Sequence, residues 1–319
     1  MTPRRWLVTG GAGFIGAHVV SALVNRGDAV VVLDDLSTGK ASALPERRTR
    51  LIVGDIRDEA LVRAALEGCS GVVHLAARSS VPRSMAEPEA AFSVNAGGAA
   101  VLCSAARAQG VLTIVYASSS SVYGDDPVLP RHEARPVAPL SPYAGSKAAS
   151  EAVFMGWGAA FGLRTVGLRF FNVYGPGQVP GGPYALAVPA FLHAALSATP
   201  ATVFGDGLDT RDYTYVDDVV AAVLASLSRA AQVSGRVFNI ATGHGTSVLA
   251  LHAASAAAVG RTVPPRHLPA RAGDQRASWA DVSAARNDLG WCARVMLVDG
   301  LARTAAAMSA QPAESSTPK

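Results

Sequence analysis

Short runs of aliphatic and β-branched residues alternate with longer Ala- and Leu-rich stretches through the first half of the chain. The short runs predict strands at Trp6–Val8, Ala29–Leu33, Arg50–Val53, Gly71–Leu75 and Leu112–Ala117. The longer stretches predict helices, among them Ile15–Arg26, Glu59–Leu66 and Ala96–Gln109. Strands that alternate with helices at this spacing favour right-handed crossovers, so the pattern predicts a doubly wound, parallel α/β sheet. Ligands bind such sheets at the carboxyl ends of the strands.

The pattern changes after about residue 125. A proline-rich stretch from Asp126 to Pro142 predicts a surface loop near that end of the sheet. A second stretch rich in glycine and proline, Gly175 to Pro189, predicts a loop that contacts a ligand. A helix at Val216–Ala230 and a strand at Arg236–Ala241 are expected further along.

Composition indicates a packed globular protein. Of the 319 residues, 50% are hydrophobic and 16% are charged. No apolar run is long enough to cross a bilayer, so no membrane partner is expected. The formal charge of +4 is small, and no aromatic residues interleave with the basic cluster between residues 47 and 50, so no nucleic-acid partner is expected. Three scattered cysteines favour a reducing cytoplasm and give no metal-ligand spacing: Cys69, Cys103 and Cys292.

A glycine-rich turn links the first predicted strand to the first predicted helix. Gly10 permits a tight turn, Gly13 lets the backbone approach a pyrophosphate, and Gly16 allows the helix to pack closely on the sheet. Asp34 ends the second strand, where a carboxylate accepts hydrogen bonds from ribose hydroxyls and repels a 2′-phosphate. The sequence therefore predicts an NAD site, with NAD preferred over NADP, formed by Gly10, Gly13, Phe14, Ile15, Gly16 and Asp34.

With the NAD site placed near the N-terminus, the sequence predicts how the chain divides into domains. Residues 1–170 are expected to form an NAD-binding Rossmann domain, to which later segments can return. Residues 171–310 are expected to form mainly a smaller, mixed α/β substrate-binding domain. The polar, proline-bearing segment 311–319 is predicted to be a disordered tail.

Tyr143 and Lys147 stand four residues apart in Tyr-Ala-Gly-Ser-Lys, so a helix places them on one face. A lysine cation one turn away stabilises the phenolate, which lets the tyrosine act as a base near neutral pH. Ser119 belongs to a serine run that follows an apolar strand, where its hydroxyl can hydrogen-bond the reacting oxygen. An ordinary surface pair and a polar turn are the alternatives for each feature taken alone.

The ordered series of motifs resembles the extended short-chain dehydrogenase/reductases, within their nucleotide-sugar epimerase and dehydratase group. The resemblance extends to about residue 305 and is nearest to the UDP-glucose and UDP-N-acetylglucosamine 4-epimerases of that group. It rests on Thr9–Gly16, Gly54-Asp55-Ile56, His74–Ala77, Asn95, Ser118–Gly124, Tyr143–Lys147, Asn172–Gln178, Thr210–Asp218 and Arg271–Asp281.

The resemblance also implies site residues. Ser119, Tyr143 and Lys147 would be catalytic, and the last two would also contact the cofactor. The remaining cofactor contacts would be Asp55 and Ile56 beside the adenine, with Ala76, Ala77 and Asn95 along the cleft. Asn172, Arg211 and Arg271 would bind the diphosphate of a nucleotide sugar, unless the arginines serve as structural ion-pair partners. Further substrate contacts would come from Asp274 at the uridine ribose, Phe204 near the base, and Ser120, Ser121, Gln178 and Ser278.

Two positions favour one reaction of the group. The dehydratases of this resemblance carry an Asp-Glu pair directly after the catalytic Ser or Thr, and here Ser120 and Ser121 stand there. We therefore expect NAD-dependent 4-epimerisation of a UDP-hexose through a transient 4-keto sugar, with NAD tightly bound. Ser278 lies at the gate of the hexose pocket, where a small residue leaves room for a 2-N-acetyl group, so N-acetylated sugars are expected alongside the plain hexoses.

The sequence leaves other functions open. Uronate-acting relatives place an arginine shortly after the Asn-Val-Tyr-Gly segment, and this chain has none there, but Arg78 or Arg83 can substitute. A UDP-uronate 4-epimerase, a decarboxylase or a UDP-sugar dehydratase is thus the alternative. A non-catalytic NAD-binding regulator is disfavoured because it has no need of the serine, tyrosine and lysine.

The resemblance also implies a homodimer through the helices Ala96–Gln109 and Tyr143–Phe161.

Overall fold

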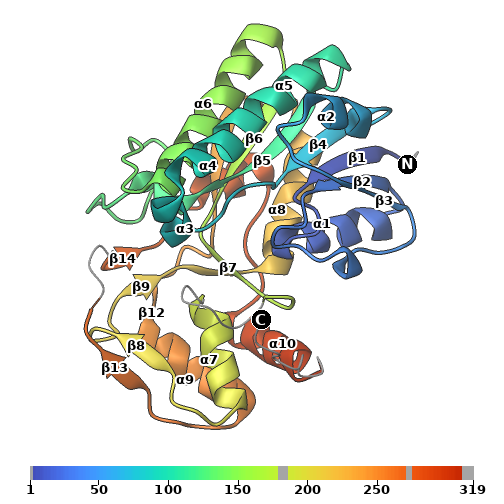
Figure 1. Cartoon of the computed structure of the whole chain (residues 1–319). Helices are drawn as coiled ribbons and strands as arrows, with labels where there is room; N and C mark the ends of the chain where they lie inside the picture. The colour runs from blue at the N-terminus through green and yellow to red at the C-terminus, as the bar shows by residue number, and fades with distance from the viewer. Residues whose placement is uncertain (1–2, 179–185, 271–274, 311–319) are drawn as a thin grey trace.

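The computed structural model of the protein describes residues 3–178, 186–270 and 275–310. In this part of the chain, seven strands form one parallel sheet in the order β11-β6-β5-β4-β1-β2-β3 (Figure 1). The order reverses between β1 and β4, so a crevice opens there at the carboxyl ends of the strands. The predicted doubly wound parallel sheet is confirmed. The strands are β1 (Arg5–Thr9), β2 (Ala29–Asp34), β3 (Thr49–Val53), β4 (Gly71–His74), β5 (Thr113–Ser119), β6 (Arg164–Phe170) and β11 (Arg236–Ile240).

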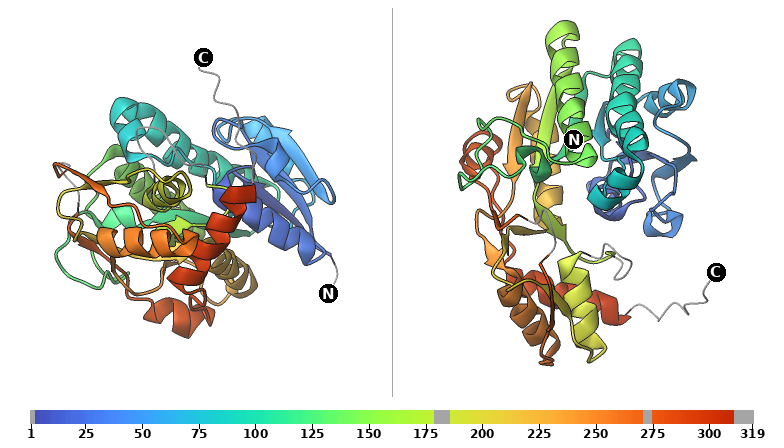
Figure 2. Two further views of the ribbon diagram at one scale, coloured as in Figure 1. Left: turned by 90° about the horizontal axis from the view of Figure 1, so that it is seen from below. Right: turned by 60° about the vertical axis from the view of Figure 1, so that its left-hand side comes forward.

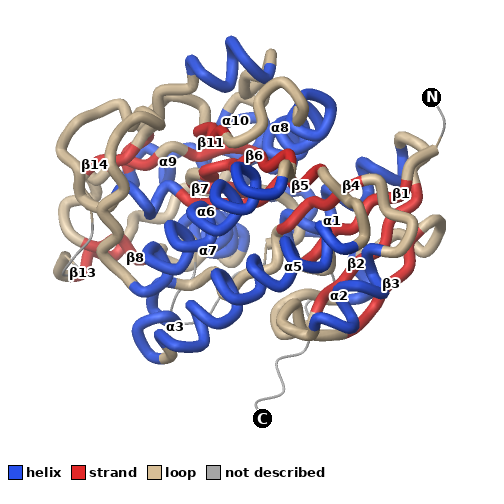
Figure 3. The backbone as a smooth tube through the Cα atoms, turned by 90° about the horizontal axis from the view of Figure 1, so that it is seen from above, coloured by secondary structure: helices blue, strands red, loops and turns tan. Residues whose placement is uncertain are grey.

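Helices cover both faces of this sheet. One face is covered by α1 (Phe14–Asn25) and α8 (Val216–Arg229). The other face is covered by α2 (Glu59–Leu66), α5 (Gly98–Ala108) and α6 (Pro142–Phe161), and α5 runs beside α6 (Figure 3). Because the inner strands are covered on both sides, they are continuously apolar rather than alternating, as in the Ala-Val-Val-Val-Leu run of β2.

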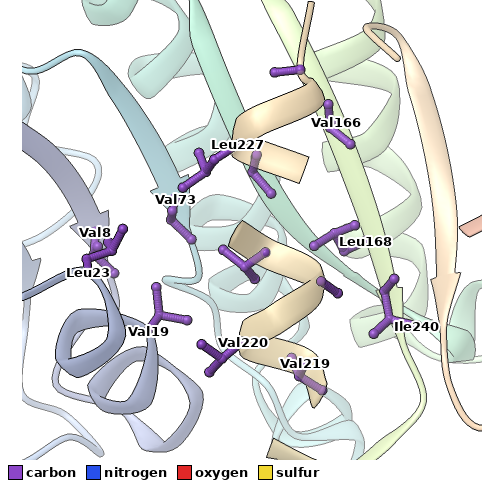
Figure 4. Packing of buried hydrophobic residues seen from close by; sticks show 14 of the residues in the cluster. Val8, Val19, Leu23, Val73, Val166, Leu168, Val219, Val220, Leu227 and Ile240 are labelled. Carbon is purple, nitrogen blue, oxygen red and sulfur yellow. The ribbon is translucent and has the colours of Figure 1, made fainter. Parts of the chain in front are cut away.

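Figure 4 shows the core between α1, α8 and the sheet. Aliphatic side chains of the two helices meet those of the strands, and burial of each contributes about 1.5–3 kcal/mol. This packing fixes α1 under the carboxyl end of β1. The residues include Val19 and Leu23 of α1, Val219, Val220 and Leu227 of α8, and Val8, Val73, Val166, Leu168 and Ile240 of the strands.

The second half of the chain builds a smaller lobe beyond the carboxyl ends of the strands (Figures 1 and 2). Its helices α7 (Ala187–Leu196), α9 (Val248–Val259) and α10 (Leu297–Ala310) share an apolar core. None of the described helices of the protein is both long and apolar enough to cross a membrane. The strands of this lobe pair as β7 (Asn172–Tyr174) with β10 (Tyr213–Tyr215), β8 (Thr202–Phe204) with β13 (Arg266–Leu268), and β9 (Thr210–Arg211) with β12 (Thr246–Ser247) and β14 (Ala277–Ser278).

The chain crosses between the two lobes through short links. Only Phe171 separates β6 from β7, while α8 and β11 return to the sheet from the smaller lobe. A domain boundary at residue 170 stays a prediction. The predicted tail, 311–319, lies outside the described residues.

Three segments differ from the sequence-based expectation. Strand β6, which lies between β5 and β11 in the sheet, was not among the predicted strands. The helix predicted at Ala96–Gln109 begins as a π-helical turn at Ser93–Gly97, preceded by α3 (Val81–Ala86) and α4 (Pro88–Phe92). The wider turn aims Asn95 inwards, so this polar side chain is buried. The loop predicted at the surface contains Arg131, which is only 2% exposed. Its backbone bridges the segment after β14, because Arg131 N donates to Trp279 O at 2.8 Å and Asp281 N donates to Arg131 O at 2.8 Å.

The glycine turn after β1 controls how closely α1 approaches the sheet. Gly10 has a φ of +67° and its amide donates to Leu33 O of β2 at 2.9 Å. A Cβ on Gly16 would lie 2.2 Å from Gly10 O and 2.6 Å from Gly11 Cα. These are backbone atoms of the turn itself, so the close approach requires glycine at this position.

Replacing Gly16 by Ala should therefore push α1 away from the turn. We expect the free energy of unfolding to fall by about 1–3 kcal/mol and the purified protein to lose most of the NAD that the glycine turn is predicted to bind. Urea unfolding and an enzymatic assay of released NAD measure the two effects. Gly97→Ala is the matched control, since its Cβ would meet nothing closer than Phe92 O at 4.0 Å. Normal stability and NAD content in Gly16→Ala would contradict the assigned role of the turn.

Candidate active site

A cleft of about 2200 Å³ separates the carboxyl ends of the strands from the smaller lobe. Single-ligand pockets measure roughly 300–1,000 Å³, so this cleft has room for a dinucleotide and a second ligand. Its walls come from the turn after β1, the ends of β2, β4 and β5, the start of α6 and segments of the smaller lobe. The described residues bring no three metal-ligating side chains together.

The start of α1 forms the cofactor side of the cleft. Phe14, Ile15 and Gly16 line it together with Gly10 and Gly13. Gly13 is the N-cap residue of the helix and has no side chain to cap the first turn. The first amides of α1 therefore offer donors and a partial positive charge to a pyrophosphate.

Two carboxylates lie along the same side. Asp34 is buried at the end of β2, where Oδ2 accepts from Ala12 N and Oδ1 accepts from Leu36 N, both at 2.9 Å. The carboxylate thus braces the glycine turn and still lines the cleft. Asp55 also lines it, next to Ile56, and accepts a forked set of bonds from Arg57. These bonds hold the pKa of Asp55 below its usual value, so it stays an acceptor.

The segment after β4 completes the cofactor side. Ala76 and Ala77 line the cleft. Asn95, expected among the cofactor contacts, lies behind this wall instead: its Oδ1 accepts from Arg78 N at 2.8 Å and its Nδ2 donates to Ser146 Oγ at 2.8 Å. Both ends of the amide are occupied by the protein. In the described structure Asn95 therefore supports the wall rather than lining it.

The three predicted catalytic residues converge on one part of the cleft. Tyr143 and Lys147 lie in the first two turns of α6, whose N-terminus is capped by Ser141 Oγ accepting from Ala144 N at 3.1 Å. Ser119 ends β5 and caps a short 3-10 helix at Ser120–Tyr123. All three of these residues line the cleft. Burial raises the pKa of Tyr143, and its hydrogen bond with Ser119 partly offsets that rise.

Lys147 is 4% exposed, and burial lowers its pKa to about 8, against the opposing influence of Glu151. Its cation lies close enough to act on His74, which donates to or accepts from Thr9 Oγ1 through Nδ1 at 2.7 Å. Burial, and then the Lys147 charge, lower the pKa of His74 to about 3, so this histidine stays neutral. Lys147 is thus a buried amine one helical turn along α6 from Tyr143.

A buried ion pair supports this group, and sequence reasoning missed it. Arg169 of β6 donates to both carboxylate oxygens of Glu151, through Nε at 2.9 Å and a terminal nitrogen at 2.8 Å. The Ser118 hydroxyl of β5 also donates to Glu151. Although burial opposes the charge, these bonds raise the pKa of Arg169. The available signal was an acidic residue one turn beyond Lys147 on an otherwise apolar helix.

The smaller lobe contributes the expected substrate side. Asn172, Gln178, Phe204 and Arg211 all line the cleft. The Gln178 amide folds its own loop, because Nε2 donates to Val173 O at 2.9 Å and Oε1 accepts from Gly175 N at 3.4 Å. Arg211 NH1 donates to the carbonyl of Thr210 at 2.9 Å. Arg271 and Asp274 lie outside the described residues.

Ser278 is buried in β14, directly opposite Arg211 of β9 in the strand register. Ser120 and Ser121 lie in the 3-10 helix that follows Ser119. These three predicted contacts are held near the cleft, although the cleft wall itself is formed by other residues.

Asp212 is a second residue that sequence reasoning missed. It is fully buried and accepts from Thr242 Oγ1 at 2.6 Å, Thr242 N at 2.8 Å and Gly243 N at 2.9 Å. Its carbonyl also receives Asn172 N at 3.0 Å and Asn172 Nδ2 at 3.2 Å. Burial raises its pKa despite these bonds. Asp212 thus holds Asn172 beside the short link between β9 and β10. Its partners are remote in sequence and left no local signal.

Known proteins match this arrangement along nearly the whole chain. A UDP-glucose 4-epimerase of Mycolicibacterium smegmatis is 42% identical over 306 residues, covering 94% of this chain and 97% of its own length. The crystal structure of a Thermotoga maritima UDP-glucose 4-epimerase with UDP-glucose has a TM-score of 0.91 at 37% identity, covering 96% and 98% of the two chains. A Methanobrevibacter ruminantium UDP-N-acetylglucosamine 4-epimerase, complexed with UDP-N-acetylmuramic acid, has a TM-score of 0.93 at 32% identity, covering 98% and 100%.

The family itself is identified by a separate match. Residues 6–241 fit the family described as NAD dependent epimerase/dehydratase family, a span that includes the glycine turn and the Ser119, Tyr143 and Lys147 group. The resemblance expected from the sequence is confirmed, and so is NAD as the cofactor. The chain belongs to the NAD-dependent epimerase/dehydratase family.

Proposed function

We propose that this protein is a UDP-sugar 4-epimerase, which interconverts the gluco and galacto forms of a UDP-hexose while NAD stays bound. The observation that carries the proposal is that Ser119, Tyr143 and Lys147 line the same cleft as the glycine turn. The groups that move a hydroxyl proton thus lie in one cavity with the cofactor site. The turn fits a dinucleotide, because Gly10 and Gly16 leave the space that a Cβ would fill.

The residues divide the chemistry between them. Bound NAD would supply hydride-acceptor and hydride-donor chemistry for C4 of the sugar. Tyr143, as the phenolate, takes the proton of the 4-hydroxyl, Lys147 stabilises the phenolate charge, and Ser119 hydrogen-bonds the sugar oxygen. The 4-keto sugar then turns, and the same residues return the proton when hydride is delivered to its other face. No net oxidation occurs in the cycle.

The substrate side suits a nucleotide diphosphate. We assign Asn172 and Arg211, with Arg271, to the diphosphate, since charge-assisted bonds from arginine suit phosphate oxygens. Asp274 is assigned to the uridine ribose and Phe204 to the base. The 4-epimerase relatives and the bound UDP-glucose of the Thermotoga protein support these assignments.

Two features favour epimerisation of a neutral hexose over the alternatives. Ser120 and Ser121 carry no carboxyl group to serve as the acid or base in eliminating water, which disfavours a dehydratase. Arg78 lines the cleft but is paired with Glu87, and Arg83 is exposed away from the cleft wall. Neither arginine is therefore set to receive a substrate carboxylate, which disfavours uronate chemistry.

Proton NMR of the purified protein, incubated without added NAD, tests the proposal. UDP-glucose, UDP-N-acetylglucosamine and UDP-glucuronate are supplied separately. Interconversion of gluco and galacto forms is the expected result. A product that has lost water or carbon dioxide would overturn it.

Tyr143→Phe should lower kcat by about 10²–10⁴-fold, because the proton acceptor is removed. NAD content should remain close to that of the wild type, since the glycine turn is untouched. Turnover by NMR and NAD released on denaturation are measured on the same preparation. Equal loss of both, or unchanged kcat, would be inconsistent with a catalytic base at this position.

We further propose that N-acetylated UDP-sugars are accepted alongside UDP-glucose and UDP-galactose, because Ser278, which the family resemblance assigns to the gate of the hexose pocket, is small. Ser278→Tyr should then lower kcat/KM for UDP-N-acetylglucosamine relative to UDP-glucose by about ten- to 200-fold, the effect of a misfit group worth roughly 1–3 kcal/mol. Ser278→Ala is the control and should keep the wild-type ratio. Absence of turnover of either N-acetylated sugar by the wild type, with good turnover of UDP-galactose, would rule the idea out.

We also propose a cytoplasmic homodimer that pairs through α5 and α6. Cys69, Cys103 and Cys292 are all free thiols, which supports a reducing compartment. The residues at 152, 155, 156 and 159 of α6 form an exposed stripe of small and apolar side chains, at the spacing of one helix face. Such a stripe is typical of a helix that packs against another helix.

Met155→Arg should convert the dimer into a monomer, because two charges would be buried against each other across the two-fold axis. Sedimentation velocity measures the mass directly. Leu208→Arg, at an exposed residue of the smaller lobe, is the control and should leave the mass unchanged. A monomeric wild-type protein, or a dimeric Met155→Arg variant, would contradict this interface.

A further inference from the structure

We propose that His18 is a positioning residue that connects the cofactor helix α1 to the substrate wall of the cleft (residues 172–178) and so fixes the separation of the two bound ligands. This inference rests on the proposed function, which places NAD at the first turn of α1 and the nucleotide sugar against the smaller lobe. His18 lies in the second turn of α1. Its partner is Pro176, in the loop that follows β7, and both residues line the cleft.

A hydrogen bond joins the two residues. His18 Nε2 lies 2.9 Å from Pro176 O. A carbonyl oxygen only accepts, so Nε2 carries the proton and donates it to this bond. Because the loop occupies this donor, the His18 Nε2 proton is not available to a ligand. His18 therefore acts on the reaction through the substrate wall rather than by contact with the reacting atoms.

Phe14 directs the His18 ring towards the loop. The two residues lie one turn apart on α1, and their rings meet edge to face, with centroids 5.7 Å apart and an interplanar angle of 86°. Phe14 is also the first residue of the helix whose opening amides face the pyrophosphate position. The donor is thus carried by the same element that is assigned to the cofactor, one turn further along it.

The loop in turn holds the acceptor in place. The Gln178 side chain closes the loop on itself, since Oε1 accepts from Gly175 N at 3.4 Å and Nε2 donates to Val173 O at 2.9 Å. A Cβ on Gly175 would lie 2.5 Å from Val216 Cγ1 at the start of α8, so the loop backbone packs closely against that helix. The Pro176 carbonyl therefore belongs to a compact turn and does not hang free.

This bond connects the positions assigned to two phosphate groups. Asn172, assigned to the diphosphate of the nucleotide sugar, precedes Pro176 by four residues on the same wall. Other described hydrogen bonds fasten the wall to the smaller lobe, through Asn172 to Asp212 and through Tyr174 to Leu297. The bond from His18 fastens it to α1. The wall is thus held from both sides of the cleft.

Hydride transfer makes the separation of the two ligands important. Reacting atoms must come within about 3–3.5 Å of each other, and a misplacement of about 1 Å can lower the rate by about 10²-fold. In the proposed reaction, the cofactor is positioned by α1 and the sugar nucleotide by the wall. A wall released from α1 would hold the nucleotide sugar less tightly and further from the cofactor, while the glycine turn stays intact.

His18→Phe and His18→Gln in the full-length, NAD-containing protein test the inference. Phenylalanine keeps an edge-on ring but removes the donor, whereas the glutamine amide can place a donor near the position of Nε2. We expect His18→Phe to raise Kd for UDP about three- to tenfold, the effect of one lost hydrogen bond, and to lower kcat about ten- to 100-fold. NAD content should stay close to that of the wild type. His18→Gln should recover most of both losses.

Titration calorimetry with UDP, proton NMR of turnover and NAD released on denaturation measure the three effects. His244→Phe, at an exposed histidine outside the cleft wall, is the control and should change none of them. A loss of NAD content as large as the loss of UDP affinity would overturn the inference, because it would show general damage to α1. Failure of His18→Gln to recover either loss would also overturn it.

Hydrogen exchange of the wall provides a readout that does not depend on turnover. Mass spectrometry of a peptide covering residues 172–178 should show faster amide exchange in His18→Phe than in the wild type and in His18→Gln. If the wild type epimerises no UDP-sugar, the proposed function fails, and the exchange rates with the UDP affinities still decide whether His18 holds the wall. Unchanged exchange and unchanged UDP affinity in His18→Phe would contradict the inference.

Discussion

The bidentate pair between Glu151 and Arg169 joins the elements that carry the proposed catalytic residues. Glu151 belongs to α6 with Tyr143 and Lys147, while Arg169 belongs to β6. The hydroxyl of Ser118 attaches β5 to the same carboxylate. Both charges are buried, and removing one partner of such a pair typically costs about 3–5 kcal/mol, whereas an apolar replacement of both is often neutral. The pair matters here for position, because it helps to hold α6, which carries Tyr143, in place relative to β5, which carries Ser119.

From this pair, polar contacts continue towards the smaller lobe. The Arg169 guanidinium lies 4.7 Å from the ring centre of Tyr123, whose hydroxyl donates to Asn239 Oδ1 at 2.7 Å. Asn239 Nδ2 in turn donates to Arg131 O at 2.9 Å and to Asp281 O at 3.1 Å. These contacts connect the catalytic helix with the segment that follows Ser278. Arg131 is buried because it takes part in this connection, which explains why a proline-rich loop that looks exposed in sequence is partly internal.

Local patterns were enough to predict six of the seven sheet strands, the covering helices and the residues that line the cofactor side, but not β6. Gly10, Gly16 and the Tyr143–Lys147 pair depend on spacing within one turn, which a sequence displays directly. Asn95, Gln178 and Asp212 depend on partners that the fold supplies, so their contacts could not be predicted from spacing. The strands of the smaller lobe are two or three residues long, too short for an alternating pattern to emerge. Burial of Glu151 likewise follows only from the distant Arg169.

The single residue between β6 and β7 has a mechanical consequence. Phe171 is buried and is the only residue between β6 of the sheet and β7, which begins at Asn172. In the return connection, α8 begins directly after the last residue of β10. Links this short and buried make poor hinges, because a hinge needs residues free to change φ and ψ. On the proposed function, the keto sugar must present both faces to one fixed cofactor. We therefore expect the two lobes to keep a fixed relative position. The sugar itself, rather than a lobe, would rotate within the cleft to present its other face.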